Sequence, residues 1–208
     1  KPISNVALGE VYVADLKGDT LAYLKQIDVG LTGFYSKPTE FYLGLNDVEL
    51  IHPVFYMNMA EGDTTTNLFH WINQLSTGEP DTTTSSSDFR LDCNDLMITN
   101  GFFKWDDNNE AKLPRGVDWS HIGVDSLDLH FSQISIYNDS VNAFIHYLKL
   151  NEQSGFELDT LHGLAIYSNS VTQVDHMLLK SSKTRLEGAL QFSYADVIDY
   201  SEFNEKVY

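Results

Sequence analysis

Apolar and polar residues alternate along most of this chain. The pattern begins at Val11 and Val13 and recurs in segments 27–31, 41–45 and 127–131. Successive side chains of a β-strand point to opposite faces, so this alternation predicts strands with one apolar face and one polar face. We therefore expect an all-β protein, which is better suited to holding or passing a ligand than to catalysing a reaction.

Turn residues between the alternating segments predict ten or more short strands. Lys17–Thr20 contains Gly18 and Asp19, which favour a tight turn, and it is expected to join the first two strands into a hairpin. A second hairpin is predicted from segments 41–45 and 48–51. Pro53 is expected to end its regular pairing, because proline has no backbone N–H.

One helix and one long loop interrupt the strands. Leu68, Trp71, Ile72 and Leu75 follow helical spacing, so a short helix is predicted from about Asn67 to Leu75. The Ser- and Thr-rich segment 76–88 has almost nothing to bury and is predicted to be a flexible loop. The strand spacing fits a sandwich, a barrel or a solenoid.

Length and charge narrow the possible functions. The 208 residues suit one β-rich domain, or one segment of a longer repetitive protein. A net charge of −17 argues against a nucleic-acid partner, since phosphate backbones are held by basic side chains. Cys93 is the only cysteine, so an internal disulfide is excluded. The chain begins at Lys1 without an initiator Met or a signal-peptide pattern, which suggests a fragment or a processed product.

Patterns for catalysis and metal binding are weak. No two of the seven histidines have the i, i+4 spacing of a helical zinc site, and Asp106–Glu110 lacks the spacing of an EF-hand loop. Asp15 and Asp19 flank one turn and are better explained as turn residues than as a paired-carboxylate site. We therefore expect no enzyme, no cofactor and no metal site.

Seven short segments combine turns with apolar pairs: Val11–Leu21, Ile27–Val29, Thr66–Leu68, Leu96–Trp105, Gly116–Asp118, Gly155–Leu158 and Met177–Leu186. Together these segments resemble TamB/AsmA-like envelope proteins. The resemblance covers almost the whole chain and places it in the amino-terminal periplasmic part of a translocation and assembly module TamB homologue. One segment, Met177–Leu186, differs from the family pattern because Ser181 and Thr184 stand in exchanged places.

The resemblance implies a fold and a location. The implied fold is an elongated, curved antiparallel or mixed sheet of many short strands with an apolar groove, a β-taco-like shape, and a β-sandwich is the alternative. The implied location is the periplasm of a Gram-negative cell, with an inner-membrane anchor helix that is absent from this chain. The implied role is lipid transport in outer-membrane biogenesis, with an Omp85-type assembly protein as partner.

Phospholipid acyl chains are the expected ligand of such a groove. A dry apolar lining stabilises them by about 25 cal/mol per Å² of apolar surface removed from water. The same residues could instead fill an ordinary core. The predicted lining residues are Val11, Val13, Ile27, Val29, Leu31, Leu43, Leu45, Leu127, Leu129, Phe131, Leu164, Ile166, Leu190 and Phe192.

A carbohydrate-binding β-sandwich module of an exported protein is the alternative function. Trp105 and Trp119 lie beside predicted loops, where they could be exposed and stack on sugars. A planar row of exposed aromatic residues on one sheet would favour this module. An unbroken aliphatic trough running to both ends of the sheet would favour the lipid groove.

Overall fold

A computed structural model describes residues 4–37, 40–75 and 88–195 of the chain. This part of the chain contains nine strands and one helix. The elements are β1 (Ser4–Ala14), β2 (Thr20–Lys37), β3 (Glu40–Met59), α1 (Asn67–Leu75), β4 (Asp88–Asp107), β5 (His121–Tyr137), β6 (Ser140–Glu152), β7 (Glu157–Tyr167), β8 (Val171–Ser181) and β9 (Arg185–Ser193).

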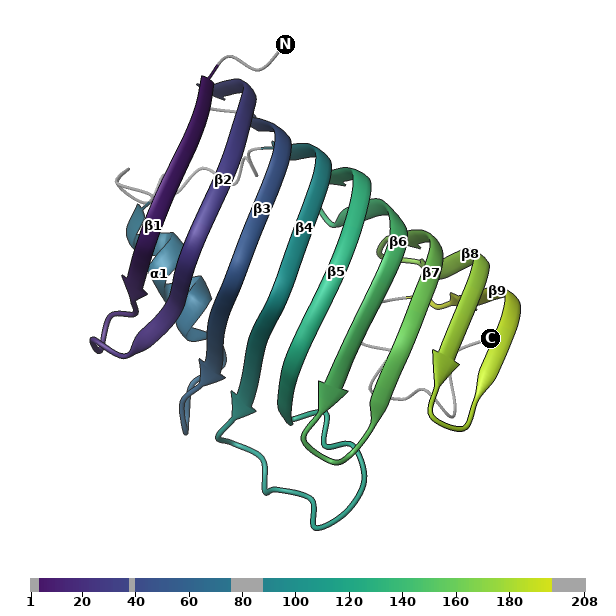
Figure 1. The fold of residues 1–208 in the computed structure, drawn as a ribbon. Coiled ribbons are helices and arrows are strands. Elements are labelled where there is room, and N and C mark those ends of the chain that lie inside the picture. The colour runs from purple at the N-terminus through teal and green to yellow at the C-terminus, as the bar shows by residue number, and fades with distance from the viewer. Residues whose placement is uncertain (1–3, 38–39, 76–87, 196–208) are drawn as a thin grey trace.

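The strands form one open sheet in sequence order from β1 to β9 (Figure 1). Neighbouring strands are antiparallel except β3 and β4, which are parallel. A parallel pair needs a crossover connection, and α1 lies within the connection between β3 and β4. The all-β prediction is therefore confirmed, with a single mixed sheet in place of the alternative sandwich.

The helix and the first hairpin lie where the sequence predicts them. Helix α1 spans Asn67–Leu75, and β1 and β2 pair around the turn that contains Gly18, whose φ is 87°. The Thr66 side chain caps the helix, because its Oγ1 accepts a hydrogen bond from the Phe69 amide at 3.1 Å. Residues 76–87 of the segment predicted as a loop lie outside the described part of the chain, and Asp88, its last residue, belongs to β4.

The prediction of many short strands is wrong, because the strands are 9 to 20 residues long. Segments 41–45 and 48–51 do not form a hairpin but belong to the single strand β3. Val29 pairs with Val48 while Leu31 pairs with Leu45, so an extra residue bulges out of β3. A bulge directs two successive side chains to one face and breaks the alternation, which makes one long strand look like two.

A second set of bulges follows a line across the sheet. Glu10, His52, Asn100 and Ser126 lie on β1, β3, β4 and β5 and all have φ between 50° and 54°. The Asn100 side chain hydrogen-bonds the His52 ring at 2.8 Å, which joins two of these bulges directly. Pro53 follows the bulge at His52 and is fully buried inside β3 instead of ending it. Bulges bend the strands that carry them, and Figure 1 shows the strands curving together.

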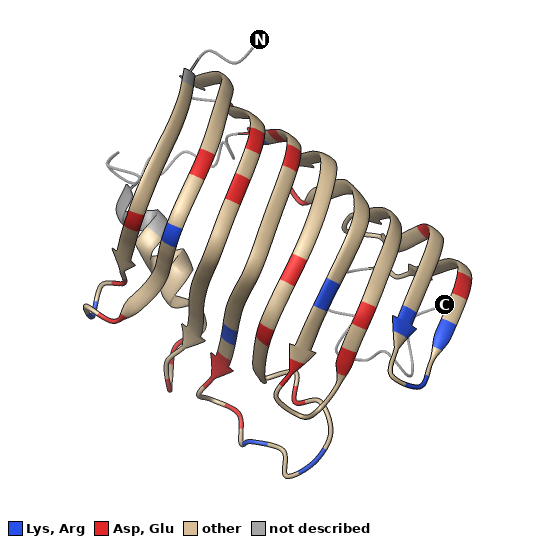
Figure 2. Cartoon of the chain, in the orientation of Figure 1, with Lys and Arg blue, Asp and Glu red and all other residues tan. Residues whose placement is uncertain are grey.

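Charged residues are spread over the whole sheet (Figure 2). Acidic positions occur along most strands, and basic positions appear in the long loop between β4 and β5. The buried core is small and central: Leu50, Ile98 and Leu129 form its cluster. Within the described residues, no helix is long and apolar enough to cross a membrane.

Candidate functional site

One row of aliphatic side chains crosses all nine strands. Its members are directly opposed from each strand to the next, so they share one face of the sheet. At a strand spacing of about 4.8 Å, the row is about 38 Å long. The row consists of Leu8, Ile27, Leu50, Ile98, Leu129, Leu148, Leu161, Leu179 and Leu186.

Two further rows widen this surface. Val48, Leu96 and Phe131 from one flank and Phe55 from the other pack against the central cluster, so all three rows lie on the same face. We call the three rows together the apolar face. The first flanking row consists of Val6, Val29, Val48, Leu96, Phe131, Ile145 and Gly163. The second consists of Val13, Ala22, Phe55, Phe103 and Val124, and Glu152 follows Val124.

All but two of the predicted lining residues point to this side of the sheet. Five of them are members of the three rows: Val13, Ile27, Val29, Leu129 and Phe131. Leu127 packs against the central cluster. Six more lie on the same face, either because their cross-strand partners lie on it or because they stand an even number of residues from a row member. They are Val11, Leu31, Leu43, Leu45, Leu190 and Phe192.

Leu164 and Ile166 lie on the opposite face, which corrects their assignment to the groove. Leu164 pairs with Phe144, whose ring contacts His146 and His162 at centroid distances of 4.8 and 5.2 Å. The neighbour Gly163 faces the apolar side instead. There β8 approaches so closely that a Cβ would lie 2.7 Å from the carbonyl oxygen of Asp175. A small residue is therefore needed on that side, and the larger side chains turn away.

Several central members of the apolar face escaped the sequence reasoning. Leu50, Ile98, Leu148 and Leu161 belong to the longest row but were not predicted as lining residues. A bulge or register shift separates each from part of its own strand's alternating pattern. The sequence signal that could have identified them is their type, since each is a leucine or an isoleucine close to such an interruption.

The apolar face is dry in the middle and open at both edges. Leu50 is 8% exposed and Leu129 is 7% exposed, whereas Leu8 on β1 and Leu186 on β9 are each 50% exposed. Among the described residues, β1 pairs only with β2 and β9 only with β8. The row therefore reaches the two free edges of the sheet without a polar side chain closing it.

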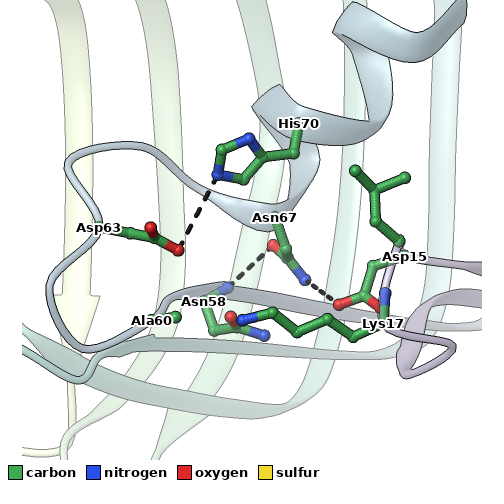
Figure 3. Close-up of a pocket in the computed structure, with 8 residues that line it drawn as sticks. Asp15, Lys17, Asn58, Ala60, Asp63, Asn67 and His70 are labelled. Carbon is green, nitrogen blue, oxygen red and sulfur yellow. Dashed lines mark hydrogen bonds and ion pairs between the residues drawn. The ribbon is translucent and has the colours of Figure 1, made fainter.

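A polar pocket of about 270 Å³ lies where the turn between β1 and β2 meets the start of α1 (Figure 3). Asp15 accepts hydrogen bonds at 2.9 Å from the amides of Lys17 and Asp19, so its carboxylate shapes the turn. Asn67 accepts a bond from the Asn58 amide at 3.0 Å and donates to the carbonyl of Tyr56 at 3.2 Å. These polar groups hold the turn and the helix together, and His70 Nε2 lies 3.1 Å from Thr65 Oγ1 and 4.0 Å from Asp63 Oδ2.

Histidines gather on the face opposite the apolar rows. The rings of His130 and His146 stack at 4.2 Å, and His130 Nε2 lies 2.7 Å from Asp95 Oδ2. Ser132 Oγ lies 2.8 Å from His146 Nε2. In the part of the chain that the structure describes, no three His, Cys, Asp or Glu side chains are placed to hold a metal ion.

Comparison of the chain with protein-family models, with curated proteins and with solved structures found no match.

Proposed function

We propose that the protein is a non-enzymatic periplasmic segment of a TamB/AsmA-like protein whose apolar face shields lipid acyl chains between the inner and outer membranes. In this role it supports outer-membrane biogenesis together with an assembly protein of the Omp85 type. The observation that carries the proposal is the aliphatic row, which stays apolar from Leu8 on β1 to Leu186 on β9. An acyl chain needs no directional contacts, and each CH₂ group that it buries contributes about 0.8 kcal/mol.

The dimensions of the row suit this ligand. The row is about 38 Å long at ordinary strand spacing. One leaflet of a bilayer has a hydrocarbon thickness of about 15 Å, half of the ~30 Å core. An extended acyl chain therefore fits along the row with length to spare. In the described part of the protein β1 and β9 each pair with one strand only, which allows the acyl chain to move along the row and leave it at an end.

The aromatic residues give less support to the alternative, a carbohydrate-binding module. Trp119 is 75% exposed, but it lies alone in the loop between β4 and β5, and Trp105 is only partly exposed. Phe41 stacks on Phe89 with ring centroids 5.6 Å apart, so these rings cover each other. A sugar-binding platform needs several exposed rings in one plane, and the longest row of the sheet is aliphatic instead.

Lipid extraction and native mass spectrometry of the protein purified from a Gram-negative host test the proposal. We expect phospholipid to co-purify with the wild type and to be lost from Leu129→Asp and Val29→Glu, because each places an unpaired charge on the apolar face. The matched control is Gln133→Asp, which adds the same charge to β5 at an exposed position.

Loss of folding could imitate loss of binding in Leu129→Asp, since Leu129 is buried. Leu186→Asp avoids this problem, because Leu186 is 50% exposed at the sheet edge and its substitution leaves the core intact. A folded Leu186→Asp variant should carry less lipid than Gln133→Asp. A wild-type protein free of lipid, or equal lipid content in every variant, would contradict the proposal.

A further inference from the structure

The second flanking row of the apolar face ends in a carboxylate. Phe103 pairs with Val124 on β5, and Val124 pairs with Glu152, the last residue of β6. Directly opposed residues share a face, so Glu152 points to the same side of the sheet as the apolar rows. It stands at their rim, where the strands give way to the loop between β4 and β5.

The Glu152 carboxylate is buried and incompletely paired. The residue is 7% exposed, and its Oε2 accepts a hydrogen bond from the Ser154 amide at 2.8 Å. Oε1 is shielded from solvent and has no hydrogen-bond partner. Burial raises the pKa of Glu152, but hydrogen bonding from Ser154 and the nearby backbone amides outweighs it and lowers the pKa below the ordinary value. A charged oxygen without a donor is costly in such a place.

Unpaired positive charges line the other side of the same cavity. The cavity has a volume of about 340 Å³ and is lined by Glu152 together with Lys112 and Arg115 of the loop between β4 and β5. Lys112 and Arg115 are exposed and form no ion pair with any other residue that the structure describes. The cavity therefore offers cationic groups on the loop and one anionic acceptor at the end of the strand.

Two further polar side chains of the cavity, Asp118 and His121, bond to each other and to the backbone of the loop. Asp118 Oδ2 accepts a hydrogen bond from the Leu113 amide at 2.8 Å, and Oδ1 accepts one from the Ser120 amide at 3.1 Å. His121, which is 4% exposed, has its Nδ1 3.1 Å from Asp118 Oδ2. These bonds anchor both ends of the loop segment that carries Lys112 and Arg115.

We propose that this cavity binds the head group of a phospholipid that carries a phosphate and a primary ammonium, while the acyl chains of the same lipid lie on the apolar face. The inference rests on the proposed function. The ammonium donates a hydrogen bond to Glu152 Oε1, and the phosphate contacts Lys112 and Arg115. Because Oε1 is shielded from solvent, the ammonium must displace the side chains that cover it.

The donor chemistry separates this head group from others. A quaternary ammonium has no N–H to donate, so a choline head group leaves Glu152 Oε1 unpaired. An anionic glycerol head group satisfies the two basic side chains but provides no cation for Glu152. A phosphoethanolamine head group meets both requirements.

Dihexanoyl phospholipids below their micellar concentration test the inference by calorimetric titration of the full 208-residue chain. We expect the ethanolamine lipid to bind about tenfold more tightly than the choline lipid, the effect of one charge-assisted hydrogen bond. Glu152→Gln should abolish this preference. The matched control is Glu157→Gln, an exposed carboxylate at the start of β7.

The Lys112→Gln, Arg115→Gln double variant provides a second test on an exposed loop, where folding is not at risk. It should weaken binding of both the ethanolamine and the choline lipid. Equal affinity of the wild type for ethanolamine and choline lipids overturns the head-group site and leaves the acyl-chain proposal standing. Failure to bind any of the lipids overturns the proposed function as well. Equally tight binding of phosphoethanolamine without acyl chains assigns the cavity to a free small molecule and overturns the lipid assignment.

Discussion

The same leucine-to-alanine substitution should have very different effects along the longest aliphatic row. Leu129 stands near the middle of the row and is 7% exposed, whereas Leu186 stands at the edge on β9 and is 50% exposed. Leu→Ala removes three carbons, worth about 2.4 kcal/mol when fully buried at about 0.8 kcal/mol each. Leu129→Ala should lose nearly all of this transfer free energy. The cavity that it leaves adds to the loss, so the free energy of unfolding should fall by about 3–4 kcal/mol.

Leu186→Ala should cost about 1 kcal/mol, because half of its side chain is already in water and no enclosed cavity remains. Urea unfolding at equilibrium, followed by circular dichroism, gives the free energy of unfolding of both variants and the wild type. Equal costs at the two positions would refute the reasoning, since they would mean that the edge of the row is as well covered as its centre. A cost below about 1 kcal/mol at Leu129 would refute it from the other side.

Gly101→Ala should cost about 1–3 kcal/mol in urea unfolding, because its Cβ would lie 2.9 Å from an isoleucine methyl of the same strand; Gly9→Ala, with its nearest contact at 3.8 Å, is the control, and equal costs would contradict the packing argument. Stability should also fall in acid. The pKa values of Asp118 and Glu152 are lowered in the folded protein, so the unfolded chain takes up protons first as the pH falls. The stability that these two carboxylates contribute is therefore complete above the ordinary carboxyl pKa and is lost as the pH falls through their folded-state pKa values. Urea unfolding between about pH 6 and about pH 3 measures how the free energy of unfolding depends on pH. Glu152→Gln should make this pH dependence flatter, and an identical slope in the variant would contradict the role of Glu152. Finally, β9 pairs only with β8 among the described residues, so this edge strand should make the protein associate with rising concentration, and Leu190→Lys should reduce this in sedimentation velocity; a wild type that stays monomeric would exclude edge pairing.

Local patterns predicted part of this fold correctly. The turn at Gly18 and the helix from Asn67 to Leu75 depend on neighbouring residues, and both lie where the sequence placed them. The strand count was wrong because segments 41–45 and 48–51 look separate although β3 continues through them. A bulge residue and a turn residue have the same polar character, so a single sequence does not distinguish them.

The candidate site was predicted in kind but not in full. Alternation identified Ile27, Val29, Leu129 and Phe131 as members of one face, because each lies in an unbroken alternating run. Glu152 gave no such signal. Its role at the rim depends on the pairing with Val124 and on the loop that carries Arg115 across the strand ends.

By itself, the sequence determined that the chain forms strands with one apolar face, because side-chain direction along a strand has a period of two and is a local property. The tertiary structure decided the register between strands. Register aligned the bulges, brought Leu8 and Leu186 into one row across nine strands and set Glu152 at the end of another. These relations join residues far apart in the chain, and their free energy comes from packing between strands, which no local pattern contains.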